Sequence, residues 1–354
     1  MTASVDWRLA QQVAARVGRR EPFAQSYHYA SLAPDFAELT AEAEELVAEV
    51  AGLRSLAGPA RARVTDRAGW VDANIASFQR LLRPLIDKLE AKASGASFGG
   101  VAGRLAGLEV GALLGWMSLR VLGQYDVLII EDERPEDQDL VYYVGPNVLS
   151  LEKRYAFPPR EFRLWLAVHE CTHRAQFTGV PWLRHHFLDL VQRTIDAVEP
   201  DPKRLVGALK AARDERRAGR RPLDSGLAAL FATDEQRQLL DRIGGMMSLL
   251  EGHGDIVMNR AVAERAPSAE RFARVLHARR QQSSSLVRLL QRLIGLDAKL
   301  AQYLQGEGFV LAVEAAGGRE LFDNVWRGPE WLPTMDEIRR PEEWIERVRL
   351  SHAV

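Results

Sequence analysis

The stretch LAVHECTHRAQF, residues 167–178, places two histidines four residues apart around a glutamate. On an α-helix, His169 and His173 would lie about 40° apart around the axis and about 6 Å apart along it, so both imidazoles can reach one point beside the helix. Imidazole nitrogens are common ligands of Zn²⁺. Glu170 would lie at the edge of the same face, close enough to take a proton from a metal-bound water. The spacing therefore predicts a metal site with a general base beside it.

The flanking residues predict that this segment is a buried helix. Residues at helical spacing form one inward-facing stripe, namely Phe162, Leu166, His169, His173 and Phe177. Pro158 and Pro159 suit a helix start, and Gly179 and Pro181 suit its end. Cys171 falls about 200° from His169, which makes it a packing residue and not a thiolate ligand.

Two other interpretations of the histidine pair are open at this stage. The histidines could be ordinary core residues with satisfied hydrogen bonds. The fragment Glu170-x-x-His173 also resembles half of a di-iron site in a helix bundle. That site needs a second Glu-x-x-His, which the sequence lacks.

A catalytic zinc needs a third protein ligand and an open position for water. The segment MMSLLEGHGDIVMNRAV, residues 246–262, places Glu251, His253 and Asp255 among apolar residues, where polar groups need partners. Glu251 and Asp255 share a helix face, so we expect Glu251 to bind the metal and Asp255 to hold a ligand histidine by its second ring nitrogen. His253 would point away, unless the glycines on either side of it distort the turn. The alternative is a helix contact with an internal salt bridge.

The elements that must position these groups are mostly helical. Long segments such as AELTAEAEELVAEVAGL carry apolar residues at three-and-four spacing. Strand signals occur together, in YDVLIIED (125–132) and in DLVYYVGPN (139–147), which ends in a Gly-Pro turn. The two strands are expected to form a hairpin, and the second could align an extended peptide by strand addition, with Tyr142 and Tyr143 binding substrate. The fold class is therefore mainly α with a small β-sheet, an α+β fold.

Composition narrows the class of protein and of partner. The net charge of −1 gives no reason to expect nucleic acid or an anionic membrane. A single cysteine and a start without a basic-then-apolar segment suit a cytoplasmic protein. The most apolar stretch, residues 110–119, is too short to span a bilayer, and its Gly111 and Gly115 indicate a tightly packed soluble helix.

We expect one compact unit over residues 1–354 with three consecutive parts. These are an N-terminal helical part (1–124), a metal-site core with the small sheet (125–265), and C-terminal helices with a wrapping tail (266–354). The oligomeric state is left open.

Several motifs together resemble a known family. HECTH followed by EGHGD is similar to the gluzincin arrangement HExxH…ExxxD. More narrowly, the chain resembles a family of zincin-like hydrolases, also labelled as associated with biosynthesis of a deazaflavin coenzyme. The resemblance rests on an early DW, HECTHRAQF, MSLLEGHGD, GLDAKLAQYLQGEGFV, LFDNVWRGPEWLPTMDEI and PEEW. It implies a zincin-like metalloprotease fold and a zinc site, but no particular substrate. Asn259 departs from the family pattern, which has an aspartate there.

The function expected from these residues is zinc-dependent hydrolysis of an amide or peptide bond in a peptide or small amide. His169, His173 and Glu251 would hold Zn²⁺, and Glu170 would act as general base. The donor that stabilises the oxyanion is left open among four candidates, His253, Tyr142, Tyr143 and Arg260. The alternative is a metal-binding scaffold or partner-binding protein that cleaves nothing.

Overall fold

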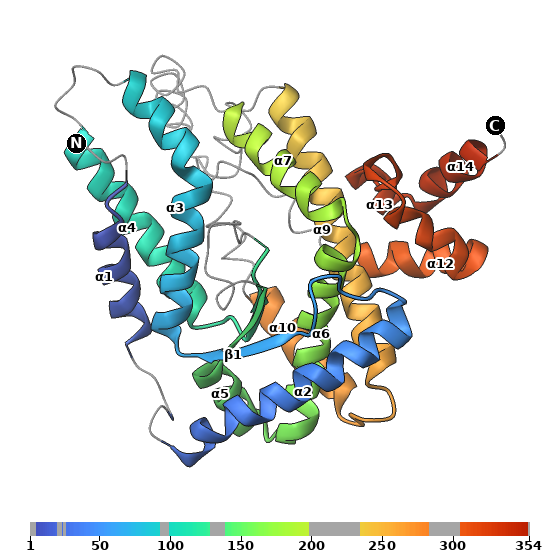
Figure 1. The fold of residues 1–354 in the computed structure, drawn as a ribbon, viewed down its shortest axis with the longest axis horizontal. Helices are drawn as coiled ribbons and strands as arrows, with labels where there is room; N and C mark the ends of the chain where they lie inside the picture. Colours follow the sequence, from blue (N-terminus) through green and yellow to red (C-terminus); the bar gives the residue numbers. More distant parts are fainter. Residues whose placement is uncertain are drawn as a thin grey trace, which may run out of the picture. The chain divides into compact units, whose positions relative to one another are not determined.

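The computed structural model describes residues 5–19, 23, 26–92, 99–127, 139–197, 234–282 and 305–352. The longer helices are α1 (Trp7–Gly18), α2 (Tyr27–Ala51), α3 (Arg67–Lys92), α4 (Gly99–Ser118), α5 (Gly145–Tyr155), α6 (Pro159–Gly179), α7 (Leu183–Asp196), α9 (Asp234–Ala261), α10 (Ala269–Gln282), α12 (Gly306–Phe322) and α14 (Pro341–His352). Shorter elements are α13 (Met335–Arg339), η3 (Asp323–Trp326) and η4 (Pro329–Trp331), and the strands are β1 (Arg61–Thr65), β2 (Gly123–Tyr125) and β3 (Leu140–Val144). Helices predominate over one small sheet, which confirms the α+β class (Figure 1).

The described residues group into two units. One comprises Met1–Leu188 with His253–Leu276, and the other comprises Asp189–Gly252 with His277–Val354. The division falls inside α9, which is a single helix. The expected compact unit with three consecutive parts stays a prediction. No described helix combines the length and apolar character needed to cross a bilayer.

The described strands form a sheet in the order β1-β3-β2. β2 pairs antiparallel with β3, but it shares only Tyr125 with the strand expected over 125–132. Asp126 and Val127 are not in a strand, and residues 128–132 lie outside the described residues, so the expected hairpin stays a prediction. β1 pairs parallel with β3 on its other side, and the sequence did not predict this strand, whose RARVT lacks the apolar run of a buried strand. Since both edges of β3 are paired, the predicted addition of a peptide to this strand is wrong.

The expected turn at the end of β3 is a helix start instead. Gly145 and Pro146 open α5, where proline at the first helical positions costs no hydrogen bond. The strand itself ends at Val144, directly before the Gly-Pro pair, as predicted.

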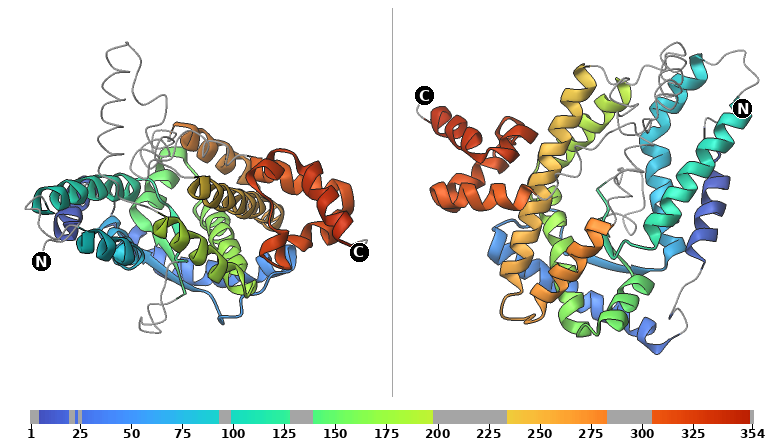
Figure 2. Two further views of the ribbon diagram at one scale, coloured as in Figure 1. Left: turned by 90° about the horizontal axis from the view of Figure 1, so that it is seen from above. Right: turned by 180° about the vertical axis from the view of Figure 1, so that it is seen from behind.

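Close backbone packing joins α1 and α4, which lie side by side in both views of Figure 2. A Cβ at Gly111 would lie 2.4 Å from the carbonyl oxygen of Ala10, and one at Gly115 would lie 2.7 Å from Val17 Cβ. Only glycine allows this approach. The prediction of a tightly packed helix is confirmed. Beside these helices, a core cluster includes Trp70 of α3 and Val144 of β3.

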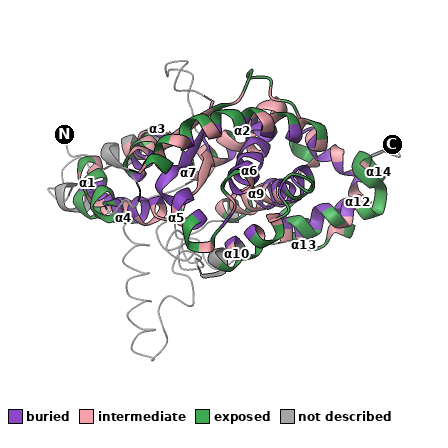
Figure 3. Ribbon diagram, turned by 90° about the horizontal axis from the view of Figure 1, so that it is seen from below, coloured by how far each residue is buried: buried purple, intermediate pink, exposed green. Residues whose placement is uncertain are grey.

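Helix α6 is the most deeply buried element that carries the predicted chemistry. It runs from Pro159 to Gly179, as predicted, and packs along α2. Buried residues cover nearly all of its faces (Figure 3). Its first turns lie in an aromatic cluster of Phe157, Phe162, Trp165 and Phe272. At Gly179 the end of α6 lies close to the backbone at Arg54, because a Cβ there would lie 2.6 Å from the carbonyl oxygen of Arg54.

The second unit positions the first half of α9. A Cβ at Gly252 would lie 2.1 Å from the carbonyl carbon of Gly306, so α9 crosses the start of α12 with backbones in contact. Gly252 therefore serves close packing and marks no distortion of the helix. The C-terminal stretch folds as η4, α13 and α14, and Trp344 is buried against Phe309 while its Nε1 donates to Trp331 O at 2.8 Å.

Candidate metal centre

The two histidines of α6 turn the same ring nitrogen toward each other. The Nε2 atoms of His169 and His173 are 3.2 Å apart, and the rings stand nearly perpendicular at 86°. The four-residue spacing thus brings both imidazoles to one point, as the helix geometry predicts. Both rings are partly buried.

Helix α9 supplies a carboxylate to the same place. His169, His173 and Glu251 each offer one ligand atom, and these atoms all lie within 4.8 Å of one another. Asp255, one turn after Glu251, has an oxygen 3.9 Å from Nδ1 of His169. That separation is longer than a hydrogen bond, so Asp255 lies near the second nitrogen of a candidate ligand, and its expected role of holding that histidine stays a prediction.

The space beside the rings fits a small cation. Zn²⁺ binds imidazole nitrogen at about 2.0–2.1 Å in tetrahedral sites, which sets neighbouring ligand atoms about 3.3 Å apart. The observed 3.2 Å between the two Nε2 atoms agrees with this spacing. Gly254 lies over the rings, since a Cβ there would be 3.3 Å from His173 Cε1 and 3.7 Å from His169 Cε1. The donor set of two imidazoles and one carboxylate therefore suits zinc, and Gly254 of α9 packs against both rings.

Glu170 lies beside this group but turns toward the sheet. It is only 6% exposed, and its Oε2 accepts a hydrogen bond of 3.1 Å from the backbone N–H of Tyr125. Gly123 is also in contact, because a Cβ there would lie 2.6 Å from Glu170 Oε1. The edge strand β2 thus forms a seat for the carboxylate, on the side of β2 that β3 leaves unpaired.

The tyrosines expected to bind substrate lie in the sheet. Tyr143 is fully buried, stacks on Phe36, and shares a 2.8 Å hydrogen bond with the hydroxyl of Thr40. Burial raises the pKa of Tyr143 well above its usual range. Tyr142 is 9% exposed on the central strand. Tyr143 therefore has the surroundings of a core residue.

The remaining candidates also have definite places. His253 is buried, and its Nδ1 lies 2.9 Å from Nε2 of Gln176. Arg260 is exposed near the end of α9. Cys171 is buried with its sulfur 3.7 Å from the carbonyl oxygen of Thr40, and burial raises the pKa of its thiol well above its usual range. A neutral buried thiol agrees with the packing role predicted for Cys171.

Gln176 is a site residue that the sequence reasoning missed. It is fully buried, and its Oε1 lies 2.9 Å from Nδ1 of His173. The sequence spacing could have identified it, because Gln176 follows His173 by three residues and so shares its helix face. A polar residue at a buried position on that face needs a partner.

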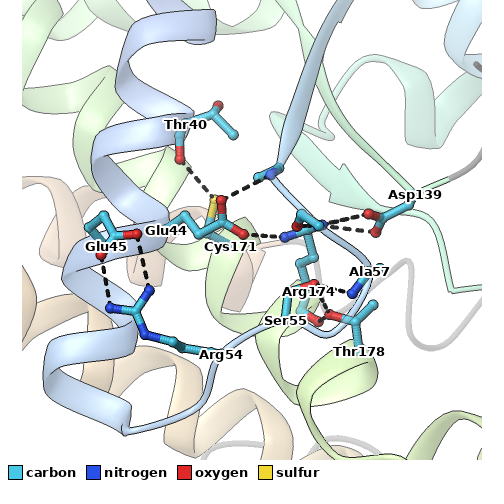
Figure 4. Close-up of polar contacts among 12 residues, drawn as sticks. Thr40, Glu44, Glu45, Arg54, Ser55, Ala57, Asp139, Cys171, Arg174 and Thr178 are labelled. Atoms are coloured by element: carbon cyan, nitrogen blue, oxygen red, sulfur yellow. Dashed lines mark hydrogen bonds and ion pairs between the residues drawn. The ribbon is translucent and has the colours of Figure 1, made fainter.

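A buried arginine joins α6 to the start of β3. Arg174 is 1% exposed, and its Nε donates to Asp139 Oδ1 at 3.0 Å. Its guanidinium also donates to Glu44 of α2 and to the carbonyl oxygen of Gly58. Figure 4 shows Arg174 between Asp139 and Glu44, with Cys171 and Thr40 nearby. These contacts hold α6 against α2 and the residue that precedes β3.

The structure combines a mainly helical fold, a small sheet, an HExxH helix and a glutamate that converges on it. This is the arrangement typical of zincins. The zincin-like metallopeptidase family matches residues 5–345, and the chain belongs to this family. The chain is also similar to the crystal structure of a "putative hydrolase with a novel fold" from Chloroflexus aurantiacus. The two share 34% identity with a TM-score of 0.74, covering 98% of this chain and 99% of that chain. The comparison with curated proteins gave no match. Family and neighbour together support a hydrolase.

Proposed function

We propose that this protein is a zinc-dependent hydrolase that cleaves an amide or peptide bond in a peptide or small amide. The observation that carries the proposal is the convergence of His169, His173 and Glu251 within 4.8 Å. Two of these residues flank Glu170 on α6, so one helix supplies both metal ligands and a general base.

The three ligands would hold Zn²⁺ through imidazole nitrogens and a carboxylate oxygen. A zinc ion bound there would lower the pKa of a water molecule and polarise the substrate carbonyl. Asp255 would orient His169 from its other ring nitrogen.

Glu170 would move the proton in the reaction. Its carboxylate accepts a proton from the attacking water as the new carbon–oxygen bond forms, and it then donates that proton to the amine nitrogen as the carbon–nitrogen bond breaks. The hydrogen bond from Tyr125 N–H fixes the carboxylate through Oε2. Because Glu170 is held by the backbone of a strand, its position does not depend on a mobile side chain.

Replacing the base separates chemistry from metal binding. Glu170→Gln keeps the size of the side chain but cannot take a proton, so hydrolysis should fall by about 10²- to 10⁴-fold. The assay incubates the protein with a tryptic digest of a denatured protein and counts new amino termini by mass spectrometry. Bound zinc is measured on the same samples and should stay at the wild-type amount.

The control is Glu264→Gln, which changes an exposed glutamate in the turn after α9 and should leave activity unchanged. Loss of zinc from Glu170→Gln would contradict the assigned role and make Glu170 structural. Zinc bound by a wild-type chain that cleaves none of the peptides would instead favour a metal-binding scaffold.

A further inference from the structure

We infer that Gln176 and His253 form a relay that sets the tautomer of His173, so that its Nε2 is the nitrogen offered to a metal. The inference rests on the proposed metal centre and deepens it. Both residues are positioning residues, because they act through His173.

The relay is a chain of two contacts in the core. His173 Nδ1 lies 2.9 Å from Gln176 Oε1, and Gln176 Nε2 lies 2.9 Å from His253 Nδ1. Gln176 is fully buried and His253 is 5% exposed. These two contacts join α6 to the half of α9 that belongs to the same unit.

Hydrogen-bond chemistry fixes the proton of each ring. An amide oxygen only accepts, so His173 must carry its proton on Nδ1, which leaves the lone pair of Nε2 directed at the metal position. The amide nitrogen only donates, so His253 accepts at Nδ1 and carries its own proton on Nε2. In the chain without metal, the 3.2 Å contact between the Nε2 atoms is then made with His169 as donor.

His253 couples the direction of the glutamine amide to a second ring. A glutamine amide can present either its oxygen or its nitrogen to a neighbour. If the nitrogen faced His173, the proton of that ring would have to move to Nε2, and the ligand lone pair would be lost. The reversal would also turn the glutamine oxygen toward Nδ1 of His253, so the proton of that ring would have to move from Nε2 to Nδ1. The two rings therefore have to change tautomer together. This assigns His253 a place behind the ligand and removes it from the four candidates for oxyanion donor.

The experiment measures zinc affinity by competition with a chelator. Gln176→Leu should bind zinc about 10- to 100-fold more weakly, the range found when an outer partner of a metal ligand is lost. His253→Ala should weaken zinc binding less, because the glutamine remains and only its direction is freed. Gln176→Glu should restore binding, since both carboxylate oxygens accept from His173 Nδ1 and the direction no longer matters.

The matched control is Thr178→Ala on the same helix. It removes side-chain hydrogen bonds to Ser55 and to the carbonyl oxygen of Arg174, and it should leave zinc affinity unchanged. Unfolding of each metal-free variant is recorded to separate a loss of folding from a loss of affinity.

A second measurement does not need the metal. Nitrogen-15 NMR of the metal-free wild-type chain should show the His173 proton on Nδ1, and it should show both tautomers in His253→Ala. A proton on Nε2 of His173 in the wild type, or a folded Gln176→Leu that binds zinc within about threefold of wild type, would overturn the inference. A wild-type chain that binds no zinc would defeat the proposed function, while the NMR result would still decide the relay.

Discussion

Two residues of β2 set the position of Glu170. Tyr125 donates a backbone hydrogen bond to it, and Gly123 has no side chain that would collide with it. The hydrogen bond from Tyr125 orients the carboxylate, and Gly123 leaves the room that the side chain fills. Gly254 lies against the two imidazoles, where an added Cβ would stand 3.3 Å from His173 Cε1 and 3.7 Å from His169 Cε1. The position of the proposed base therefore depends on the absent side chain of Gly123 as well as on the hydrogen bond from Tyr125.

Gly123→Ala should displace the base without disturbing the metal. The added Cβ would lie 2.6 Å from Glu170 Oε1 and 2.7 Å from its Cγ, so the side chain must shift. A small misplacement of a reacting group is costly, and hydrolysis of the peptide mixture should fall by about 10- to 100-fold with zinc content unchanged. In Gly308→Ala, whose Cβ would meet nothing within 4 Å, activity should stay at the wild-type rate. Unchanged activity in Gly123→Ala would show that Glu170 does not act from this seat.

Helix α6 is fixed to its surroundings by two buried arginines on different turns. Arg163 pairs with Glu152 of α5, with Nε and Oε1 2.7 Å apart, and Arg174 pairs with Asp139 and Glu44. These ion pairs lie among apolar helix contacts, so each charge depends on its partners. Loss of the arginine leaves partly buried carboxylates without their cation.

Arg174→Ala should destabilise the protein by about 3 kcal/mol, because Asp139 and Glu44 lose their shared cation. Arg174→Lys should recover only part of this, since an ammonium group cannot reproduce the fork of a guanidinium. Urea unfolding followed by circular dichroism gives the free energies. The control is Arg54→Ala, which breaks the exposed pair with Glu45 seen in the same region of Figure 4 and should barely move the midpoint. Equal shifts in the two alanine variants would mean that the buried cluster contributes no more than a surface pair.

On the scale of the whole molecule, the candidate ligands come from helices far apart in the sequence. His169 and His173 lie on α6, and Glu251 lies on α9. An unfolded chain does not hold these groups together, so a metal that binds all three binds the folded state in preference. Metal binding is then coupled to folding.

Zinc should therefore raise the unfolding temperature of the intact chain, and excess chelator should reverse the rise. At a free zinc concentration about a hundred times the dissociation constant, the added stability is about 2.7 kcal/mol. Glu251→Ala should remove most of the effect, whereas Glu264→Ala, an exposed glutamate, should keep it. Differential scanning calorimetry with and without zinc gives the comparison. An equal zinc response in Glu251→Ala would exclude Glu251 as a ligand.

The local pattern was enough to predict the helix of the two histidines, its bounds, and a carboxylate on a later helix. These predictions depend on spacing along one helix, which the 3.6-residue turn translates directly into direction. Gln176 could have been read from the same spacing.

The tertiary structure alone decided which strands pair and what surrounds Glu170. β1 lies far from β3 in the sequence, and its residues do not show that it will pair there, so the central position of β3 and the core role of Tyr143 could not be predicted. The seat at Gly123 and the contact of Gln176 with His253 join residues 47 or more positions apart. Such contacts depend on how whole elements pack, and no local sequence pattern encodes the distance between two elements.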